Sequence, residues 1–133
     1  MRVIAVFGSA GLRDREKRRI MAETSAQLAD VSVLTAEDPR TEPLDDILAM
    51  SARAMADKGQ VEGRTFWRVA DRGEAIFKAV RMARRGDIVL AFGKGHEQSM
   101  CFGTTEYPWD DRQAMRAALR GAPLGTLPTA GTK

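Results

Sequence analysis

A cation, an imidazole and a carboxylate occur together in residues 93–97, which read Gly-Lys-Gly-His-Glu. The apolar run before them, residues 88–92, predicts a buried strand that is covered on both faces. Ligands of open α/β sheets bind beyond the carboxyl ends of the strands, and glycine lets the backbone approach a ligand closely. The segment therefore predicts one wall of a ligand site, with an ordinary solvated turn as the alternative.

A second group of reactive side chains lies in residues 13–19, where five cations and two carboxylates sum to +3, the net charge of the whole chain. This basic patch follows the apolar run 3–7 and opens a predicted helix, residues 17–29, with Ile20, Met21, Thr24 and Leu28 on one face. Cations at the amino end of a helix are unfavourable unless an anion compensates them. The patch predicts a phosphate or carboxylate ligand, with a solvated charged turn as the alternative. It is too small for extended duplex DNA, so we expect no nucleic-acid partner.

The third group is Glu37-Asp38-Pro39-Arg40, which follows the apolar run 31–34. Prolines at positions 39 and 43 make this a stiff, extended loop that holds its side chains at fixed angles. The carboxyl ends of parallel strands lie at one edge of a sheet. We therefore expect the loops 8–17, 35–40 and 93–97 to converge there.

Strand-like runs alternate with helical patterns along most of the chain, which is typical of a parallel sheet with helices on both faces. Further strands are predicted at 66–69 and 88–92, further helices at about 44–58, 71–86 and 110–120, and a hairpin at 100–107 that turns at 103–104. The fold class is therefore α/β: a Rossmann-like three-layer domain with a mostly parallel sheet and a small antiparallel hairpin near the end. Residues 1–120 form one domain, and residues 121–133, rich in Gly, Pro and Thr, are expected to be a flexible tail.

Several classes of protein are disfavoured by composition. Cys101 and His96 are the only residues of their kinds, so we expect no disulfide and no metal site. No run approaches the roughly 18 apolar residues that span a bilayer, and we expect a cytoplasmic protein, most simply a monomer, with no membrane partner. The sequence contains no Walker A loop and no G-x-G-x-x-G fingerprint. Its first strand begins at residue 3, which suggests a domain boundary.

Five motifs occur in the order and spacing of the carboxy-terminal domain of the Mur ligases, over about residues 3–120. They are Val6-Phe7-Gly8-Ser9-Ala10-Gly11-Leu12-Arg13-Asp14, Leu34-Thr35-Ala36-Glu37-Asp38-Pro39-Arg40, Asp71-Arg72-Gly73-Glu74-Ala75-Ile76, Gly93-Lys94-Gly95-His96-Glu97 and Pro108-Trp109-Asp110-Asp111-Arg112. The chain most resembles the members that add the third residue of the peptidoglycan stem peptide. The resemblance implies an ATP-dependent amino-acid ligase of three domains. The first would hold the UDP-MurNAc-dipeptide, the second ATP and Mg²⁺, and this one the amino acid, so the isolated chain should be inactive.

The resemblance also implies a set of binding residues, because the family's reaction is attack by an amine on an acyl phosphate. Arg40, with Arg13 beside it, would pair with the free carboxylate of the amino acid. The Gly93 carbonyl and Glu97 would receive its ammonium, and Glu37 and Asp38 would complete the amino-acid site. Arg15 would contact a nucleotide phosphate. No catalytic residue is expected in this domain.

The match is not complete. Where the family's diaminopimelate signature reads D-N-P-R, this chain has Glu37-Asp38-Pro39-Arg40, so a carboxylate replaces an amide at Asp38. Leu12 and Glu16 also depart from the usual aspartate and glycine. The retained Arg40 favours meso-diaminopimelate over lysine. The alternative function is a stand-alone Rossmann-like module that binds a small molecule or nucleotide in a regulatory role. His96 is expected to hold its loop by hydrogen bonding rather than to act as a general base.

Overall fold

The computed structural model describes residues 1–94 and 96–132, so Gly95, expected to help a ligand approach, and Lys133 lie outside the described residues. Four strands form a parallel sheet in the order β3-β2-β1-β4, and two more form a separate antiparallel hairpin, β5-β6. The elements are β1 Val3–Phe7, α1 Arg15–Leu28, β2 Val31–Leu34, α2 Leu44–Asp57, β3 Phe66–Arg68, α3 Arg72–Met82, β4 Ile88–Ala91, β5 Ser99–Phe102, β6 Thr105–Pro108 and α4 Asp111–Leu119.

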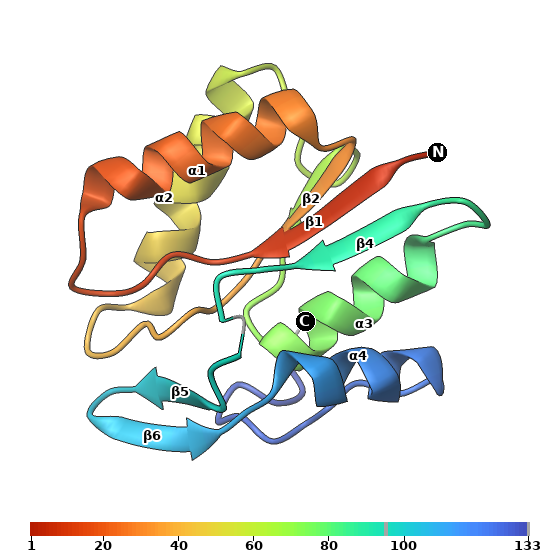
Figure 1. Ribbon diagram of the computed structural model, residues 1–133. Coiled ribbons are helices and arrows are strands. Elements are labelled where there is room, and N and C mark those ends of the chain that lie inside the picture. Colours follow the sequence, from red (N-terminus) through yellow and green to blue (C-terminus); the bar gives the residue numbers. More distant parts are fainter. Residues whose placement is uncertain (95, 133) are drawn as a thin grey trace.

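The sheet lies between two helical layers, with α1 and α2 above it and α3 and α4 below it in the view of Figure 1. Side chains alternate along β1 and enter both layers. Ile4 and Val6 pack on the side of α3 and α4, whereas Ala5 and Phe7 pack on the side of α1 and α2. This burial on both faces explains the continuous apolar runs of β1 and β2. The predicted α/β, three-layer fold with its small hairpin is confirmed.

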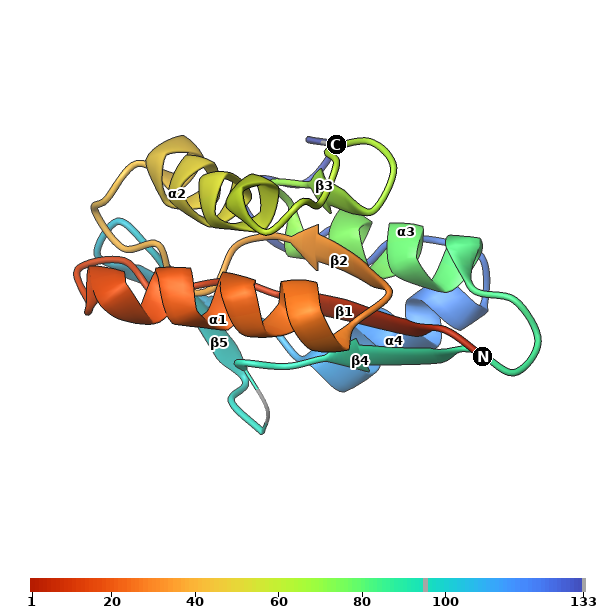
Figure 2. The ribbon, with the colours of Figure 1, turned by 90° about the horizontal axis from the view of Figure 1, so that it is seen from above.

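Strand β4 is not covered on both faces, and the expectation that it is fully buried is wrong. It is the edge of the sheet beside β1, and Ile88, Leu90 and Phe92 are 42%, 48% and 39% exposed. Seen from above, β4 lies at the margin of the sheet, outside the area that α1 and α2 cover (Figure 2). An apolar run alone cannot distinguish a central strand from an edge strand that is packed on one face only.

Helix α1 turns a different face inward from the one expected. Its buried residues are Arg18, Ala22 and Ser25, while Ile20 and Leu28 are 50% and 76% exposed. Arg18 is buried because Glu42 accepts hydrogen bonds from both of its terminal nitrogens, one of them at 2.7 Å. A buried ion pair therefore occupies the place where the apolar pattern predicted a hydrophobic contact.

Helices α3 and α4 begin within one residue of the predicted starts at 71 and 110. The side chains of Asp71 and Asp110 cap α3 and α4 by accepting hydrogen bonds from backbone N–H groups at 2.9 and 2.8 Å. The expected hairpin is also present, with Cys101 paired to Glu106 and Phe102 to Thr105. No helix in the described ranges is long and apolar enough to cross a membrane.

The segment after Gly121, expected to be a loose tail with little to bury, is attached to the domain at a few points, although most of residues 122–132 are exposed. Leu127 is only 4% exposed and belongs to the core beside α3 and α4. Thr129 donates a hydrogen bond of 2.7 Å to the Asp71 carboxylate that caps α3. Two leucines among the small and polar residues, Leu124 and Leu127, are enough to attach this segment to the domain.

Glu42→Gln should lower the free energy of unfolding by about 3 kcal/mol at neutral pH, because it removes the charge that pairs with buried Arg18. Hydrogen bonds from Arg18 and from the Leu12 N–H lower the pKa of Glu42 from 4.5 to about 2. Since the folded-state pKa lies below the unfolded one, this stabilisation is complete above pH 4.5 and is lost as the pH falls toward 2.

Urea denaturation at pH 7, 4 and 3 tests this prediction, with Glu23→Gln as the control. Glu23 pairs with the exposed Arg19, so its replacement should cost less than about 0.5 kcal/mol. The difference between the wild type and Glu42→Gln should shrink toward low pH. A difference that stays constant from pH 7 to pH 3 would contradict the assignment.

Candidate functional site

Three loops meet at the carboxyl end of the sheet, as expected: a backbone hydrogen bond joins the first two, and the Lys94 side chain links the third to Asp38. The Gly11 N–H donates to the Asp38 carbonyl at 2.9 Å, which ties the loop after β1 to the loop after β2. The Arg40 N–H donates to the Cys101 carbonyl at 3.1 Å, and the Gly103 N–H donates to the Arg40 carbonyl at 2.7 Å. The hairpin thus holds the loop 37–40 from its other side.

The loops after β1 and β2 approach so closely that a Cβ atom on Gly8 would collide with the Thr35 carbonyl and one on Gly11 with the Pro39 carbonyl. Gly93 has a φ of 105°, a conformation that favours glycine, and lies against the Glu37 carboxylate. Three residues of these loops other than glycine adopt left-handed backbone conformations: Leu12, Asp38 and Arg40, with φ of 58°, 43° and 57°. Each costs about 1 to 3 kcal/mol, and such strain clusters at functional sites.

Lys94 is the electrostatic centre of the site, a role that the sequence did not reveal. Its side chain is only 1% exposed, and its Nζ donates to both oxygens of Asp38, at 3.0 and 2.9 Å, and to Glu97 at 2.9 Å. Burial alone would lower the pKa of Lys94, but its hydrogen bonds with Asp38 and Glu97 outweigh that effect and raise it. Lys94 therefore stays protonated and links the loops after β2 and β4.

This arrangement explains how the chain accommodates a carboxylate at position 38. One Asp38 oxygen also accepts the Cys101 N–H at 2.7 Å, so Lys94 and the hairpin together occupy the carboxylate. The negative charge is compensated inside the protein. The departure from the family signature at Asp38 therefore need not repel an anionic ligand. Glu97 is half exposed and is already engaged by Lys94.

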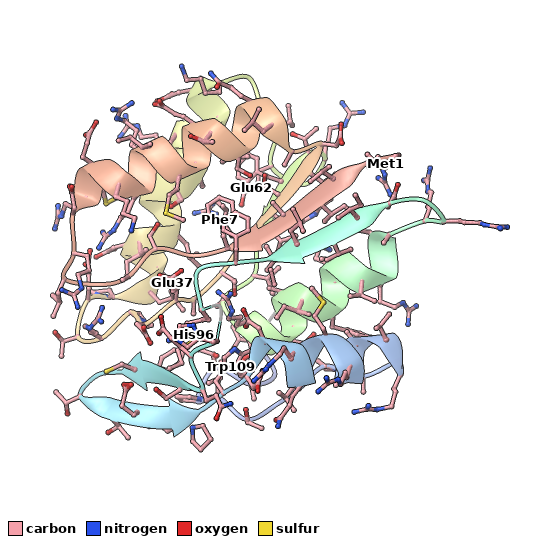
Figure 3. All side chains as sticks on the ribbon, in the orientation of Figure 1. Met1, Phe7, Glu37, Glu62, His96 and Trp109 are labelled. Atoms are coloured by element: carbon pink, nitrogen blue, oxygen red, sulfur yellow. The ribbon has the colours of Figure 1, made fainter. Side chains whose placement is uncertain are left out.

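Arg40 and Arg13 lie on the loops that the hydrogen bonds join. One terminal nitrogen of Arg40 donates to the Gly11 carbonyl at 3.0 Å and to the Asp38 carbonyl at 3.4 Å, which fixes the guanidinium over the loop after β1. Arg13 is exposed and lines a cavity that it shares with Glu37. Burial raises the pKa of Glu37, because its carboxylate lies between the loops. Glu37 and His96 are both labelled at this end of the sheet in Figure 3.

The basic patch divides into structural and exposed cations. Arg18 is buried against Glu42, and Arg19 pairs with Glu16 and Glu23 on the surface of α1. Arg13, Arg15 and Lys17 are also exposed, and the ion pairs found in residues 1–94 and 96–132 do not include them. Arg13 and Lys17 line one cavity, and Arg15 is the first residue of α1.

Arg72 is the second residue that the sequence did not single out as functional. It is fully buried, and two of its nitrogens donate to the Asp111 carboxylate, each at 2.8 Å. Other bonds reach the Ala36 carbonyl at 3.0 Å and the Phe92 carbonyl at 3.1 Å, where two site loops begin. The available signal was that Arg72 and Asp111 stand in two of the five motifs that carry the family resemblance.

His96 does not hold its loop as expected. Its imidazole is exposed, and the hydrogen bonds found within residues 1–94 and 96–132 do not include its side chain. The turn is closed instead by the Glu97 N–H, which donates to the Lys94 carbonyl at 2.8 Å. Within the same residues, no three His, Cys, Asp or Glu side chains gather in a group that could hold a metal ion.

The fold and site together define an α/β domain of Rossmann type that presents charged loops at the carboxyl edge of its sheet. A family model described as "Mur ligase, glutamate ligase domain" matches residues 1–95. The chain belongs to the Mur ligase family, as a carboxy-terminal domain of the kind found in tripeptide synthetases.

Individual relatives agree with this assignment. The chain is 47% identical over 117 residues to UDP-N-acetylmuramyl-tripeptide synthetase of Roseiflexus sp. (strain RS-1), and the alignment covers 88% of this chain and 23% of the relative. It is 44% identical over 118 residues to the UDP-N-acetylmuramoyl-L-alanyl-D-glutamate–2,6-diaminopimelate ligase of Synechocystis sp. This alignment covers 89% of this chain and 22% of the relative. A solved structure of a UDP-N-acetylmuramoyl-L-alanyl-D-glutamate–2,6-diaminopimelate ligase matches with a TM-score of 0.78 and 34% identity, over 90% of this chain and 24% of that one. The chain thus spans about a quarter of the length of these relatives.

A double-mutant cycle on Asp38→Asn and Lys94→Met should reveal strong coupling. Either single change leaves a buried charge without its main partner and should cost about 3 kcal/mol of folding stability. The double variant should lose less than the sum of the two, by at least about 1 kcal/mol, measured by urea denaturation at pH 7. The exposed pair Arg68 and Glu62 is the control, since a cycle on it should couple by no more than about 0.5 kcal/mol. Additive losses at Asp38 and Lys94 would show that the two loops are not joined through this pair.

Proposed function

We propose that this chain is the amino-acid-binding domain of an ATP-dependent ligase of peptidoglycan precursor synthesis. Its substrate would be meso-diaminopimelate, which it positions for attack on the acyl phosphate of UDP-MurNAc-L-Ala-D-Glu. The observation that carries the proposal is the convergence of Arg13 and Arg40 with the Lys94 network at one edge of the sheet. Similarity to named tripeptide and diaminopimelate ligases supports it.

The choice of amino acid rests on charge. Arg40 is oriented by two backbone carbonyls, and a fixed guanidinium suits bidentate pairing with a carboxylate. Lysine has no carboxylate at its far end, whereas diaminopimelate does. Because Lys94 and the Cys101 N–H engage the Asp38 carboxylate, this acidic side chain is held inside the protein, and the loop can still receive an anion.

The contribution of the domain to the reaction would be positioning. Holding an amine and an acyl phosphate in contact removes a large entropic barrier without any proton transfer by the protein. The joined loops, held by hydrogen bonds and a buried ion pair, would keep the amino acid in one orientation. ATP and Mg²⁺ would be held mainly by other domains of the ligase, with Arg15 reaching a nucleotide phosphate. The isolated chain should therefore not ligate.

The test is a chimera in which this chain replaces the corresponding domain of the Synechocystis ligase. With ATP and UDP-MurNAc-L-Ala-D-Glu, the chimera should form the tripeptide product faster with meso-diaminopimelate than with lysine. Trapping the acyl phosphate with hydroxylamine reports separately whether the first half-reaction survives the exchange. A chimera that forms the acyl phosphate but transfers no amino acid would overturn the proposed function. Equal or greater rates with lysine would overturn the substrate assignment.

In the same chimera, Arg40→Ala should raise the KM for the amino acid by about tenfold to a hundredfold, since a hydrogen bond to a charged group contributes about 1.5 to 3 kcal/mol. The KM for ATP should not change. Arg53→Ala is the matched control, because Arg53 is an exposed arginine on α2 with no part in the site. An unchanged amino-acid KM in Arg40→Ala would show that this loop does not bind the substrate carboxylate.

A further inference from the structure

Residues 122–132, which we call the strap, run along the carboxyl edge of the sheet, where the helices α2, α3 and α4 begin. Leu124 lines a cavity with Asp110, the residue that caps α4. Thr132 lines another cavity with Asp45, in the first turn of α2. Figure 1 shows that the chain beyond α4 turns back and returns to the start of α3. The strap therefore lies beside the starts of three helices, at the edge that carries the site.

The strap contacts the first turn of α3 directly. The Thr129 hydroxyl donates a hydrogen bond to Asp71 Oδ1 at 2.7 Å, and the Glu74 N–H donates to Asp71 Oδ2 at 2.9 Å. The Leu124 carbonyl lies so close to Gly73 that a Cβ atom at position 73 would collide with it. One side chain and one backbone group of the strap thus hold the turn in place.

The bond from Thr129 matters because Asp71 is fully buried. In residues 1–94 and 96–132, the hydrogen bonds found for its side chain give each carboxylate oxygen one donor, and Thr129 is one of the two. A buried polar atom that loses its only partner is costly, so the surrounding structure shifts to find another donor or water. Removing the Thr129 hydroxyl should therefore displace the residue that caps α3.

The next residue in the chain, Arg72, connects this turn to the site. Its guanidinium donates to the Ala36 carbonyl at 3.0 Å and to the Phe92 carbonyl at 3.1 Å, where the loops 37–40 and 93–97 begin. Arg72 is fully buried, and close-packed interiors transmit strain rather than absorb it. A shift of the first turn of α3 should therefore reach both loops.

We propose that the strap positions the amino-acid site through the N-cap of α3, with Thr129 as its positioning residue. Thr129 holds Asp71, Asp71 fixes the first turn of α3, and Arg72 in that turn holds the ends of two site loops. Thr129 acts through these residues and does not touch the ligand. This inference rests on the proposed function, because it states what the strap positions.

Amide hydrogen exchange in the 133-residue chain tests the mechanical part of the proposal. The Arg40 and Cys101 N–H groups report on the loop 37–40, since their hydrogen bonds tie it to the hairpin. Thr129→Val should accelerate exchange at these two amides about fivefold more than at the amides of β1 and β2, through local opening of the loop. Thr129→Ala, which also removes the hydroxyl, should behave in the same way. Thr129→Ser keeps the hydroxyl and should restore slow exchange.

Thr132→Val is the matched control. Thr132 is an exposed threonine of the strap, and the hydrogen bonds found in the described part of the chain do not include its side chain. Its replacement should leave exchange at the site loops unchanged. Thermal unfolding verifies that each variant is folded.

Kinetics of the chimera with the Synechocystis ligase test the functional part. Thr129→Val should raise the KM for meso-diaminopimelate about fivefold, because a small displacement of a binding loop weakens substrate positioning. The KM for ATP should not change, and Thr129→Ser should match the unsubstituted chimera. A general loss of stability would not separate the two KM values in this way.

The outcomes distinguish this inference from the proposed function. If the unsubstituted chimera transfers no amino acid, the proposed function fails, and hydrogen exchange still decides whether the strap holds the loops. If Thr129→Val accelerates exchange equally in β1, β2 and the site loops, the strap contributes only stability and the inference is wrong. An unchanged KM for meso-diaminopimelate in Thr129→Val would overturn the inference as well.

Discussion

The ion pair between Arg72 and Asp111 is the constraint on which the site depends. Arg72 is fully buried at the start of α3, and its guanidinium reaches Asp111 at the start of α4 and the carbonyls that end β2 and β4. Trp109 Nε1 donates at 2.7 Å to Asp111 Oδ1, the oxygen that also accepts the hydrogen bond from Arg72 Nε, and this fixes the carboxylate. A single planar cation therefore sets the positions from which the loops 37–40 and 93–97 begin. Such a pair stabilises little compared with apolar packing, but removing one partner is costly, so its main effect is to specify one arrangement.

Most of the fold could be predicted from the sequence because its signals are local. The apolar runs of β1 and β2, the capping aspartates of α3 and α4 and the glycine of the hairpin each determine structure within a few residues. The predictions that were wrong concerned contacts between residues far apart in the sequence. Leu127 has no periodic neighbours, and nothing near Arg18 in the chain indicates that Glu42 would bury it. The exposed face of β4 follows from strand order, which no local pattern encodes.

The location of the site could be predicted from the sequence, but the pairing of its charged side chains could not. The three loops were expected at one edge because parallel strands end together, and the hydrogen bonds from Gly11 and Lys94 to Asp38 show that they meet. Which charges neutralise each other could not be predicted, since Asp38 and Lys94 lie 56 positions apart. The sequence shows a carboxylate at position 38 where the family signature has an amide, and only the structure shows that Lys94 pairs with it.

The strained residues and the unpaired buried side-chain atoms found in residues 1–94 and 96–132 lie at the same edge of the sheet. Leu12, Asp38 and Arg40 hold left-handed conformations there, and Ser9 and Glu37 carry buried atoms without partners. Each of these features makes the free domain less stable, and a sequence selected only for folding would remove them. The buried pairs of Arg72 and Lys94 hold the loops in this arrangement in the absence of ligand. A ligand that binds at these loops then meets groups that are already in place, so little of its binding energy is needed to order the protein.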